Sequence, residues 1–483
     1  MRNSTLLLLT IVVLVLLLLF VPVRPPEERV EGSETSESPS DKDREISILV
    51  SIWGMPWEDA LFKDYYCREF ERLHPNVRVR FIRLAGDMVS KYMLWHIRGD
   101  GTGADVLRQH TGSYLRLVDA GVNEPLDGYI NHPETGIDDL NDYIPETLEA
   151  MTVNGRLYGL PADLNTVCLL YNKDLFDAYN REHTDSPISY PTNDWTWEDL
   201  RRAAKALTVR KGARTEIYGF DFMRSSGEFN AFLLQAGGRI WNEDKTRTLI
   251  DSPEALEVIR FWKDLTTELQ IARPSAMRDT AMGPDKFFQF GKTAMLIDGT
   301  WRLPDVLLQA PGMRFGAVCM PRHRRAVSVG GSTLWAISSD SRNKEVAWEF
   351  IKFVNSPENL HKYWDMLWVA PPSRLSVLFS EKFKFTSGLA RNGEVFIPGF
   401  PRESFEDLAG WMLEALSVNP ETGKRRVTLE DASRYGELYA RRLQVALDRI
   451  FLPESTYDPE TELRRCAEDI NLEISQKLRA RGD

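Results

Sequence analysis

Residues 46–84 read ISILVSIWGMPWEDALFKDYYCREFERLHPNVRVRFIRL and contain three successive patterns. ISILVSIW (46–53) is an almost continuous apolar run, as in a strand buried on both faces of a parallel sheet. WEDALFKDYYCREFERLHP has apolar residues at helical spacing and ends at Pro75. VRVRFIRL (77–84) alternates, as a half-buried strand does. This order predicts a βαβ unit with a right-handed crossover.

The alternation of strands and helices continues along the chain. ADVLRQ (104–109) predicts a third strand, so we expect a mostly parallel sheet. Thr196, with Asp199 three residues later, predicts the start of a helix, and Ser252-Pro253 predicts another. Further expected elements are a turn and short strand in 154–161, a strand running into a helix in 166–176, a strand in 330–339, a helix in 344–354 and mainly helix from about residue 400. The chain is therefore predicted to be α/β.

Length and charge limit the classes of protein. At 483 residues the chain is too long for one compact core, so two or more lobes are expected. A hydrophobic content of 43% beside 27% charged residues is ordinary for a globular protein. The formal net charge is -11, and no Lys/Arg stripe alternates with aromatic residues. Both observations argue against a nucleic-acid partner.

The N-terminal segment carries a targeting signal. Residues 5–23 hold no charge and match the roughly 20 residues that span a bilayer, and residues 1–4 form a short positive n-region. Residues 24–44 are rich in Pro, Ser and Glu without an aromatic residue, which predicts a disordered tether. Because 21–23 is a poor cleavage site and no lipidation cysteine follows, we expect an uncleaved signal anchor, with a cleaved secretory peptide as the alternative. Either places the rest of the chain outside the cytoplasm, in the periplasm or at the cell surface.

Motifs for catalysis, metals and nucleotides fail on spacing or context. Seven scattered histidines and four separated cysteines give no metal-ligand spacing such as HExxH, and no GxSxG is present. Gly99-x-Gly101-x-x-Ala104 precedes its strand instead of following one. The GKT in FGKTAMLIDGTW (290–301) has Lys286 where a phosphate-binding loop needs glycine, and it follows a helix-like stretch and precedes a strand-like one. We expect no enzyme, no metal and no cofactor, and no disulfide pairing is favoured.

Eight short motifs follow one another between residues 45 and 375. They are Tyr158-Gly159-Leu160-Pro161, Leu170–Phe176 (LYNKDLF), Trp195–Leu200 (WTWEDL), Gln235-Ala236-Gly237-Gly238, Phe290–Met295 (FGKTAM), Gly299-Thr300-Trp301, Gly330-Gly331-Ser332 and Ala347–Phe350 (AWEF). In this order the chain resembles the family 1 extracellular solute-binding proteins of ABC importers, the sugar-binding group that includes maltose-binding proteins. Each motif alone is weak and the collinear set is specific, although the last hundred residues match less well.

The resemblance implies a type II-like periplasmic-binding-protein fold, with two hinge-linked lobes and a helical C-terminal region. The first lobe is expected over 45–160 plus 330–365, and the second over 161–329 plus 366–483. The expected function is that of a monomer that captures a carbohydrate, an oligosaccharide or sugar derivative, between its lobes and delivers it to the permease subunits of an ABC importer. A membrane-anchored glycoside hydrolase and a ligand sensor with the same fold are the alternatives.

The resemblance also places aromatic residues at the cleft between the lobes. Trp301 follows the predicted strand AMLID, Trp53 ends the first strand, and Trp241 follows Gly237-Gly238. An indole offers a flat apolar face to the C–H groups of a sugar ring. Burial in the core of a lobe is the alternative for Trp53 and Trp301, and a position in a lid is the alternative for Trp241.

Four polar residues complete the candidate site. Gln109 and His110 follow the third strand, where relatives place ligand contacts, although His110 has a structural alternative. Asp163 follows YGLP and can accept two sugar hydroxyls, unless it is an ordinary solvated aspartate. Arg374 lies where the chain is expected to cross between the lobes for a third time. Its planar fork suits vicinal hydroxyls, a uronate, a phosphate or a structural salt bridge.

Overall fold

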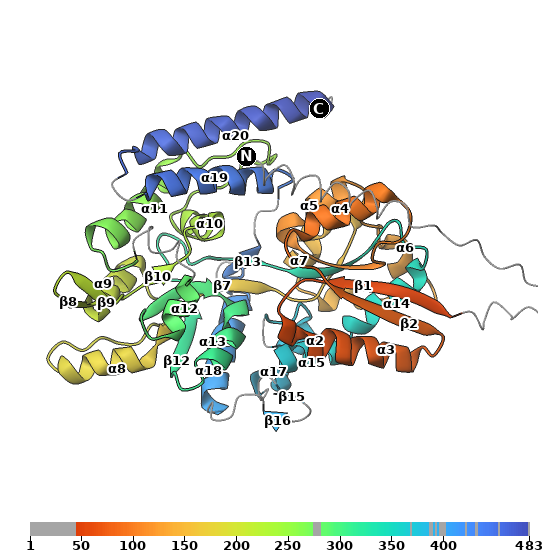
Figure 1. The fold of residues 1–483 in the computed structure, drawn as a ribbon, viewed down its shortest axis with the longest axis horizontal. Helices are drawn as coiled ribbons and strands as arrows, with labels where there is room; N and C mark the ends of the chain where they lie inside the picture. The colour runs from red at the N-terminus through yellow and green to blue at the C-terminus, as the bar shows by residue number, and fades with distance from the viewer. Residues whose placement is uncertain are drawn as a thin grey trace, which may run out of the picture. The chain divides into compact units, whose positions relative to one another are not determined.

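The computed structural model describes residues 45–273, 282–367, 370–385, 390–391, 394–395, 402–420, 423–429, 433–452 and 455–481. Glu45–Asp483 form one compact unit that contains two main β-sheets, one in each lobe (Figure 1). The predicted n-region, anchor and tether lie outside the described residues. In the part of the chain that the structure describes, no helix has the length and apolar character needed to cross a membrane.

The first sheet has the strand order β2-β1-β3-β14-β6. Its strands are β1 (Ile46–Ile52), β2 (Val77–Arg83), β3 (Val106–His110), β6 (Leu160–Pro161) and β14 (Thr333–Ile337). β1 pairs in parallel with β2 and β3, which confirms the predicted βαβ unit. β14 runs antiparallel to both β3 and β6. The sheet is therefore mixed, not mostly parallel, because β14 enters it from the second sheet.

Helices connect and cover the strands of this first lobe. Between β1 and β2 the predicted helix is present as η2 (Pro56–Glu58), α2 (Asp59–Leu61), a π-helical segment η3 (Phe62–Cys67) and α3 (Arg68–Leu73). The others are α4 (Met88–Arg98), α5 (Thr111–Asp119), α6 (Asp127–Ile130), η4 (Leu140–Asp142), α7 (Pro145–Ala150), α14 (Lys344–Val354) and α15 (Pro357–Leu367), with a hairpin of β4 (Thr152–Val153) and β5 (Arg156–Leu157). α14 covers the residues predicted for it.

The second sheet has the order β10-β11-β7-β13-β17, with β12 also paired to β7. Its strands are β7 (Asn165–Asn172), β10 (Asp221–Phe222), β11 (Met295–Gly299), β12 (Phe315–Cys319), β13 (Ser328–Gly331) and β17 (Val427–Leu429). All eight residues of β7 are buried, and the strand runs antiparallel to β11, β12 and β13. β7 is therefore the central strand of this lobe.

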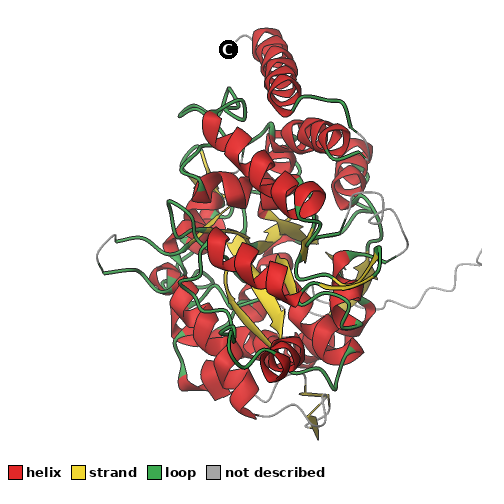
Figure 2. Ribbon diagram, turned by 90° about the vertical axis from the view of Figure 1, so that its left-hand side faces the viewer, coloured by secondary structure: helices red, strands yellow, loops and turns green. Residues whose placement is uncertain are grey.

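The helices of the second lobe include those that the sequence predicted. They are α8 (Lys173–Glu182), α9 (Trp197–Leu207), α10 (Ser226–Gln235), α11 (Pro253–Lys263), η5 (Asp264–Glu268), α12 (Pro284–Gln289), η7 (Thr300–Arg302), α13 (Leu303–Gln309), α16 (Leu375–Leu378), α17 (Glu381–Phe385), α18 (Arg402–Leu416), α19 (Gly436–Ile450) and α20 (Pro459–Arg481). Hairpins are formed by β8 (Val209–Lys211) with β9 (Arg214–Ile217) and by β15 (Ala390–Arg391) with β16 (Glu394–Val395). Figure 2 shows how the helices surround the strands.

Three chain segments lie side by side where the two sheets meet. The chain passes from β6 to β7 through Ala162, and from β13 to β14 through Ser332. The Ala162 amide donates to the Thr333 carbonyl (2.9 Å), and the Ser373 amide donates to the Ala162 carbonyl (3.1 Å). The stretch 330–339, predicted as one strand, is thus two strands in different sheets. These adjacent segments form the hinge of a two-lobed fold.

Candidate functional site

A cavity of about 710 Å³ lies between helices of the two lobes. The first lobe contributes the beginnings of α4 and α5, and the second contributes the beginning of α10, Trp241 and the residues at the start of α19. The lining residues used below are Thr111, Gly112, Arg116, Gly227, Trp241, Arg434, Tyr435, Glu437 and Tyr439. A ligand in this cavity would therefore contact both lobes.

Aromatic side chains form one wall of the cavity. The rings of Trp241 and Tyr439 lie 5.2 Å apart, and Trp241 is only 2% exposed because it also packs into the core of its lobe. Tyr435 is 5% exposed, and among the described residues its buried hydroxyl has no hydrogen-bond partner. A buried hydroxyl without a partner is costly, so it is suited to bonding with a ligand. The wall is thus built from largely buried aromatic side chains, and the Tyr435 hydroxyl has no partner among the described residues.

Four helices begin at the cavity. The first residues of α4, α5, α10 and α19 all line it. The first turn of a helix has amide groups without intrahelical partners and carries a partial positive charge. Some of these amides are already used: His110 Nδ1 accepts from the Gly112 amide (3.1 Å), and Ser225 Oγ accepts from Gly227 (3.2 Å). The Thr111 and Gly436 amides likewise donate within the protein, to the carbonyls of Ser332 (3.0 Å) and Ser433 (2.9 Å).

Two ion pairs join the lobes at the edge of the cavity. Arg116 on α5 pairs with Glu437 on α19, and Arg434 pairs with Asp119 on α5 (3.4 Å). Each lobe contributes one cation and one anion, spaced three residues apart. The opening between the lobes is therefore bridged by complementary charges.

Trp53 and His110 contact each other behind the start of α5. Their rings meet edge to face at 6.2 Å, and His110 is the residue that caps α5. A Cβ on Gly331 would lie 2.4 Å from His110 Nε2, so the imidazole packs directly on the crossing segment. Trp53 is half-buried. Neither residue lines the cavity, but both support the start of α5, which does.

Trp301 lies on η7, immediately after β11. Its side chain is 39% exposed, and its ring covers Gly299, where a Cβ would meet ring atoms at 2.2 Å. α12 precedes the GKT stretch and β11 follows it, which confirms the predicted helix–strand order. The indole is therefore available to solvent, although it lies outside the lining of the 710 Å³ cavity.

The other three predicted polar residues are bonded within the protein. Gln109 exchanges two hydrogen bonds with Asn123 (2.8 and 3.0 Å) and is fully buried. Arg374 donates to Asp139 (2.5 Å) and Asp142 (3.2 Å), which is the structural alternative that the sequence left open.

Asp163 is also 0% exposed, so it is not the solvated aspartate of the sequence-based alternative. Its carboxylate accepts from the Thr333 amide (2.9 Å), the Thr333 hydroxyl (2.5 Å) and the Tyr363 hydroxyl (2.8 Å). Gln109, Asp163 and Arg374 thus have partners within the protein, and their predicted contacts with a ligand stay predictions.

Tyr435 and Tyr439 were not among the sequence-based candidates. They belong to the C-terminal region, where the resemblance to known proteins is weaker. The only local signal there was aromatic residues near a helix start in SRYGELYA (433–440). Among the described residues, no group of three or more His, Cys, Asp or Glu side chains is placed to hold a metal ion.

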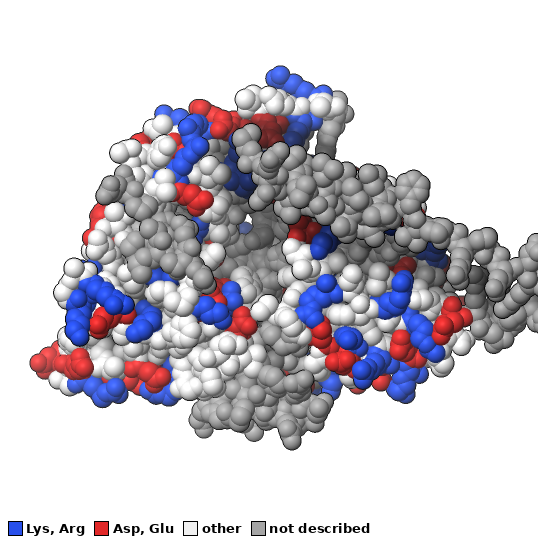
Figure 3. Space-filling view, in the orientation of Figure 1, with Lys and Arg blue, Asp and Glu red and all other residues white. Residues whose placement is uncertain are grey.

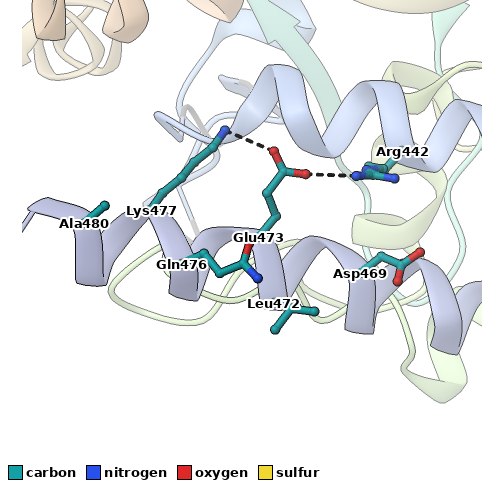
Figure 4. A pocket seen from close by; sticks show the side chains of 7 residues that line it. All are labelled: Arg442, Asp469, Leu472, Glu473, Gln476, Lys477 and Ala480. Carbon is teal, nitrogen blue, oxygen red and sulfur yellow. Dashed lines mark hydrogen bonds and ion pairs between the residues drawn. The ribbon is translucent and has the colours of Figure 1, made fainter.

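A second depression, of about 540 Å³, lies between α19 and α20. Figure 4 shows Glu473 between Arg442 and Lys477, to which it is paired at 3.0 and 3.2 Å. Apart from Leu472 and Ala480, the residues that line this depression are polar or charged. On the face drawn in Figure 3, positive and negative side chains are likewise interspersed. The interlobe cavity, with its aromatic wall and helix beginnings, is the stronger candidate site.

Curated proteins with related sequences are binding proteins. A putative binding protein of Brucella abortus is 26% identical over 295 residues, covering 59% of this chain and 66% of the relative. A maltotriose-binding protein of Pyrococcus abyssi is 26% identical over 251 residues, covering 50% of this chain and 49% of the relative. The chain thus matches from about half to just under two thirds of the length of these relatives.

Solved structures share the fold. An ABC substrate-binding protein of Listeria monocytogenes in complex with cycloalternan has a TM-score of 0.72 at 22% identity, covering 89% of this chain and 99% of that one. Maltose-bound MalE3 of T. maritima has a TM-score of 0.69 at 19% identity, covering 88% and 99%. The two-lobed α/β fold is therefore that of these binding proteins. The profile of the bacterial extracellular solute-binding protein family matches residues 65–390, more than half of the chain, and the protein belongs to this family.

Proposed function

We propose that this protein captures an oligosaccharide or sugar derivative between its lobes, outside the cytoplasm, and delivers it unaltered to an ABC importer. The interlobe cavity carries the proposal. Its volume of about 710 Å³ lies within the roughly 300–1,000 Å³ of small-molecule sites. Aromatic rings suit the C–H faces of sugars, and helix amides suit their hydroxyls.

Relatives that bind sugars support the choice of ligand class. The Pyrococcus abyssi relative is named for maltotriose, and the two similar structures hold cycloalternan and maltose. We assign ligand contacts to Trp241, Tyr435 and Tyr439 in the cavity wall. Trp301 is assigned a contact with the part of a longer saccharide that projects from the cavity.

The partners follow from the same proposal. The closed, ligand-bound monomer would be presented to the permease subunits, and residues 5–23 would hold it at the membrane. Since the ligand contacts both lobes, binding stabilises the closed arrangement that the permease recognises.

A thermal-shift screen tests the proposal. The purified protein is heated with maltotriose, other neutral oligosaccharides and acidic oligosaccharides, and a bound sugar raises the melting temperature. Tyr435→Phe removes one hydroxyl without opening a cavity and is expected to weaken binding about threefold to tenfold. Tyr457→Phe, at a tyrosine that is 44% exposed, is the matched control and should bind normally.

The bound sugar is then recovered and chromatographed. Intact sugar is the expected result, whereas shorter products would show a glycoside hydrolase instead. If no saccharide in any class raises the melting temperature, the proposal of a carbohydrate ligand is wrong. Trp301→Ala is expected to remove most of the shift for a long saccharide without unfolding the protein.

A further inference from the structure

The turn that carries Trp53 is built around a buried carboxylate. β1 ends at Ile52, and Gly54 adopts a φ of +139°, which L side chains rarely adopt. A Cβ on Gly54 would lie 1.8 Å from a carboxylate oxygen of Glu58, so the turn folds directly onto this side chain. The Met55 amide donates to the same carboxylate. Glu58 thus fixes the backbone at Gly54 and Met55.

Arg108 holds this carboxylate and Trp53 together. Its side chain is buried on β3, at 2% exposure. Nη1 donates to the Trp53 carbonyl (3.0 Å) and to Glu58 Oε1 (3.3 Å), and the guanidinium lies 5.2 Å from the centre of the Trp53 ring. One planar group therefore contacts the main chain, the ring and the counter-ion, which a lysine ammonium cannot do in the same way.

The same guanidinium is connected to the hinge. Arg108 Nη2 donates to the Tyr363 hydroxyl (3.3 Å), which donates to Asp163 (2.8 Å). Asp163 in turn accepts from the amide of Thr333 (2.9 Å), next to the crossing at Ser332. These side chains are buried throughout, so the hydrogen bonds are sheltered from competing water.

On the other side, Trp53 contacts the wall of the cavity through His110. Its ring meets His110 edge to face, and His110 caps α5, whose first residues line the cavity. Arg108 and His110 are two residues apart on β3 and so lie on one face of the sheet. A continuous series of contacts thus runs from the hinge to the cavity.

We propose that Arg108 is a positioning residue for ligand binding, which fixes Trp53 and through it His110 and the start of α5. The inference rests on the proposed function for its ligand, but the position of Trp53 can be tested without one. Arg108→Met alone would leave the Glu58 charge buried without its partner and destabilise the fold. The test variant is therefore Arg108→Met with Glu58→Gln, in which both groups are neutral.

Fluorine NMR of protein labelled with 5-fluorotryptophan reads out the indole directly. The chain has 13 tryptophans, and the signal that disappears in Trp53→Phe is the signal of Trp53. We expect the double variant to move or broaden the Trp53 signal while the other signals stay in place. An unchanged Trp53 signal in the folded double variant would overturn the proposal.

A matched buried pair in the other lobe serves as the control. Arg273 and Asp221 form an ion pair that is 0% and 1% exposed. Arg273→Met with Asp221→Asn removes the same chemistry there and should leave the Trp53 signal unchanged. A shift of the Trp53 signal in this control as large as in the test variant would show a general loss of order and also overturn the proposal.

Binding is measured by calorimetry with maltotriose as the probe. The test variant is expected to bind about tenfold more weakly at a temperature at which it remains folded. If the moved Trp53 signal comes with unaltered affinity, the positioning role in binding is wrong. If maltotriose does not bind the unaltered protein, the choice of sugar fails, while the NMR result still decides whether Arg108 positions Trp53.

Discussion

Asp163 shows how a carboxylate suited to sugar hydroxyls can instead serve the hinge. It accepts three hydrogen bonds from Thr333 and Tyr363 at 0% exposure. Thr333 lies 170 residues away in the sequence and Tyr363 lies 200 away. An ionised carboxylate only accepts hydrogen bonds, which matches the three donors that surround Asp163. The position of Asp163 is therefore set by contacts between the crossing segments.

Replacing Asp163 tests this structural role. Asp163→Asn introduces two N–H donors where only donors approach, so at least one buried hydrogen bond is lost. We expect the free energy of unfolding in urea to fall by about 1–3 kcal/mol. Asp194→Asn, at an exposed aspartate, should change it by no more than about 0.5 kcal/mol. Equal effects at the two positions would contradict the assignment.

Glu58 gives the stability of the protein a defined dependence on pH. Burial raises the pKa of its carboxyl above the usual value, although the charge of Arg108 opposes part of the rise. A raised folded-state pKa means that folding favours the protonated acid. The stabilisation is therefore complete below the unfolded-state pKa and is lost as the pH rises through the folded-state pKa.

We therefore expect Glu58→Gln to destabilise the protein more near pH 4 than near pH 7. The unfolded-state pKa of glutamate is about 4.3, so the stability that Glu58 contributes begins to fall near this pH and continues to fall up to the folded-state pKa. Urea denaturation of the variant and the unaltered protein at a series of pH values measures the difference. A difference that is the same at every pH, or larger at neutral pH, would show that the folded-state pKa is not raised.

At the level of elements, the register of β7 and β12 brings two cysteines face to face. Cys168 pairs with Cys319 across these antiparallel strands. The Lys173 amide donates to the Arg314 carbonyl (2.8 Å), whereas the Cys319 amide donates to Asn193 Oδ1 (2.9 Å) and not to β7. Hydrogen-bonded and non-hydrogen-bonded residue pairs alternate along two antiparallel strands. Counted from the hydrogen-bonded pair Lys173 and Arg314, Cys168 and Cys319 form a non-hydrogen-bonded pair, whose Cα atoms are typically about 4.5 Å apart. This separation is within the range of disulfides.

We expect these two thiols to be linked when the reduced, urea-unfolded protein refolds with oxidised glutathione. The thiols lose two hydrogens, and the glutathione disulfide is reduced to two thiols. In the folded protein both are buried, and burial raises the pKa of the Cys319 thiol to about 11, so the native protein should resist oxidation. Peptide mapping without reductant should find Cys168 joined to Cys319. Linkage of either one to Cys67 or Cys466 would contradict the register.

Elements set by local chemistry could be predicted from the sequence. Thr196 and Asp199 form the expected capping box at the start of α9, and Ser252 caps α11. The helix before the GKT stretch and the strand after it were also predicted correctly. At the starts of α9 and α11 a neighbouring side chain accepts from a first-turn amide, so no distant contact is needed there.

Features set by distant contacts could not be predicted. The stretch 330–339 contains no proline and no charged residue, and only its pairing with β7 on one side and β3 on the other divides it at Ser332. Tyr435 became a candidate through the packing of α19 beside α5, which no local pattern indicates. Gln109, Asp163 and Arg374 have the right chemistry for a ligand, but partners from remote segments bind them instead.

For the unit as a whole, the ion pairs between α5 and α19 predict an effect of charge on closure. Glu437→Arg places two cations together at the edge of the cavity and should weaken the affinity for maltotriose by up to about fivefold, the range of exposed pairs. Adding Arg116→Glu exchanges the two charges and should restore binding. The effect should decline in concentrated salt because exposed charges are screened.

A second exposed pair provides the control for the charge exchange. Among the ion pairs of the described residues, Arg464 and Glu460 pair with each other within α20, at 2.7 Å, and not with the first lobe. The same reversal and exchange there should leave binding unchanged. If exchange at Arg116 and Glu437 fails to restore affinity, the pair does not act between the lobes.

The meeting of four helix beginnings at one cavity has a consequence for how specificity changes over time. Main-chain amides are present whatever residue occupies a position, so substitutions in the wall alter the shape of the cavity but keep its donors. On the proposed function, a copy of the gene would acquire a different sugar by exchanging a few rings, while the main chain at the helix beginnings stays the same. Duplication followed by such exchanges would yield a set of uptake receptors from a single backbone.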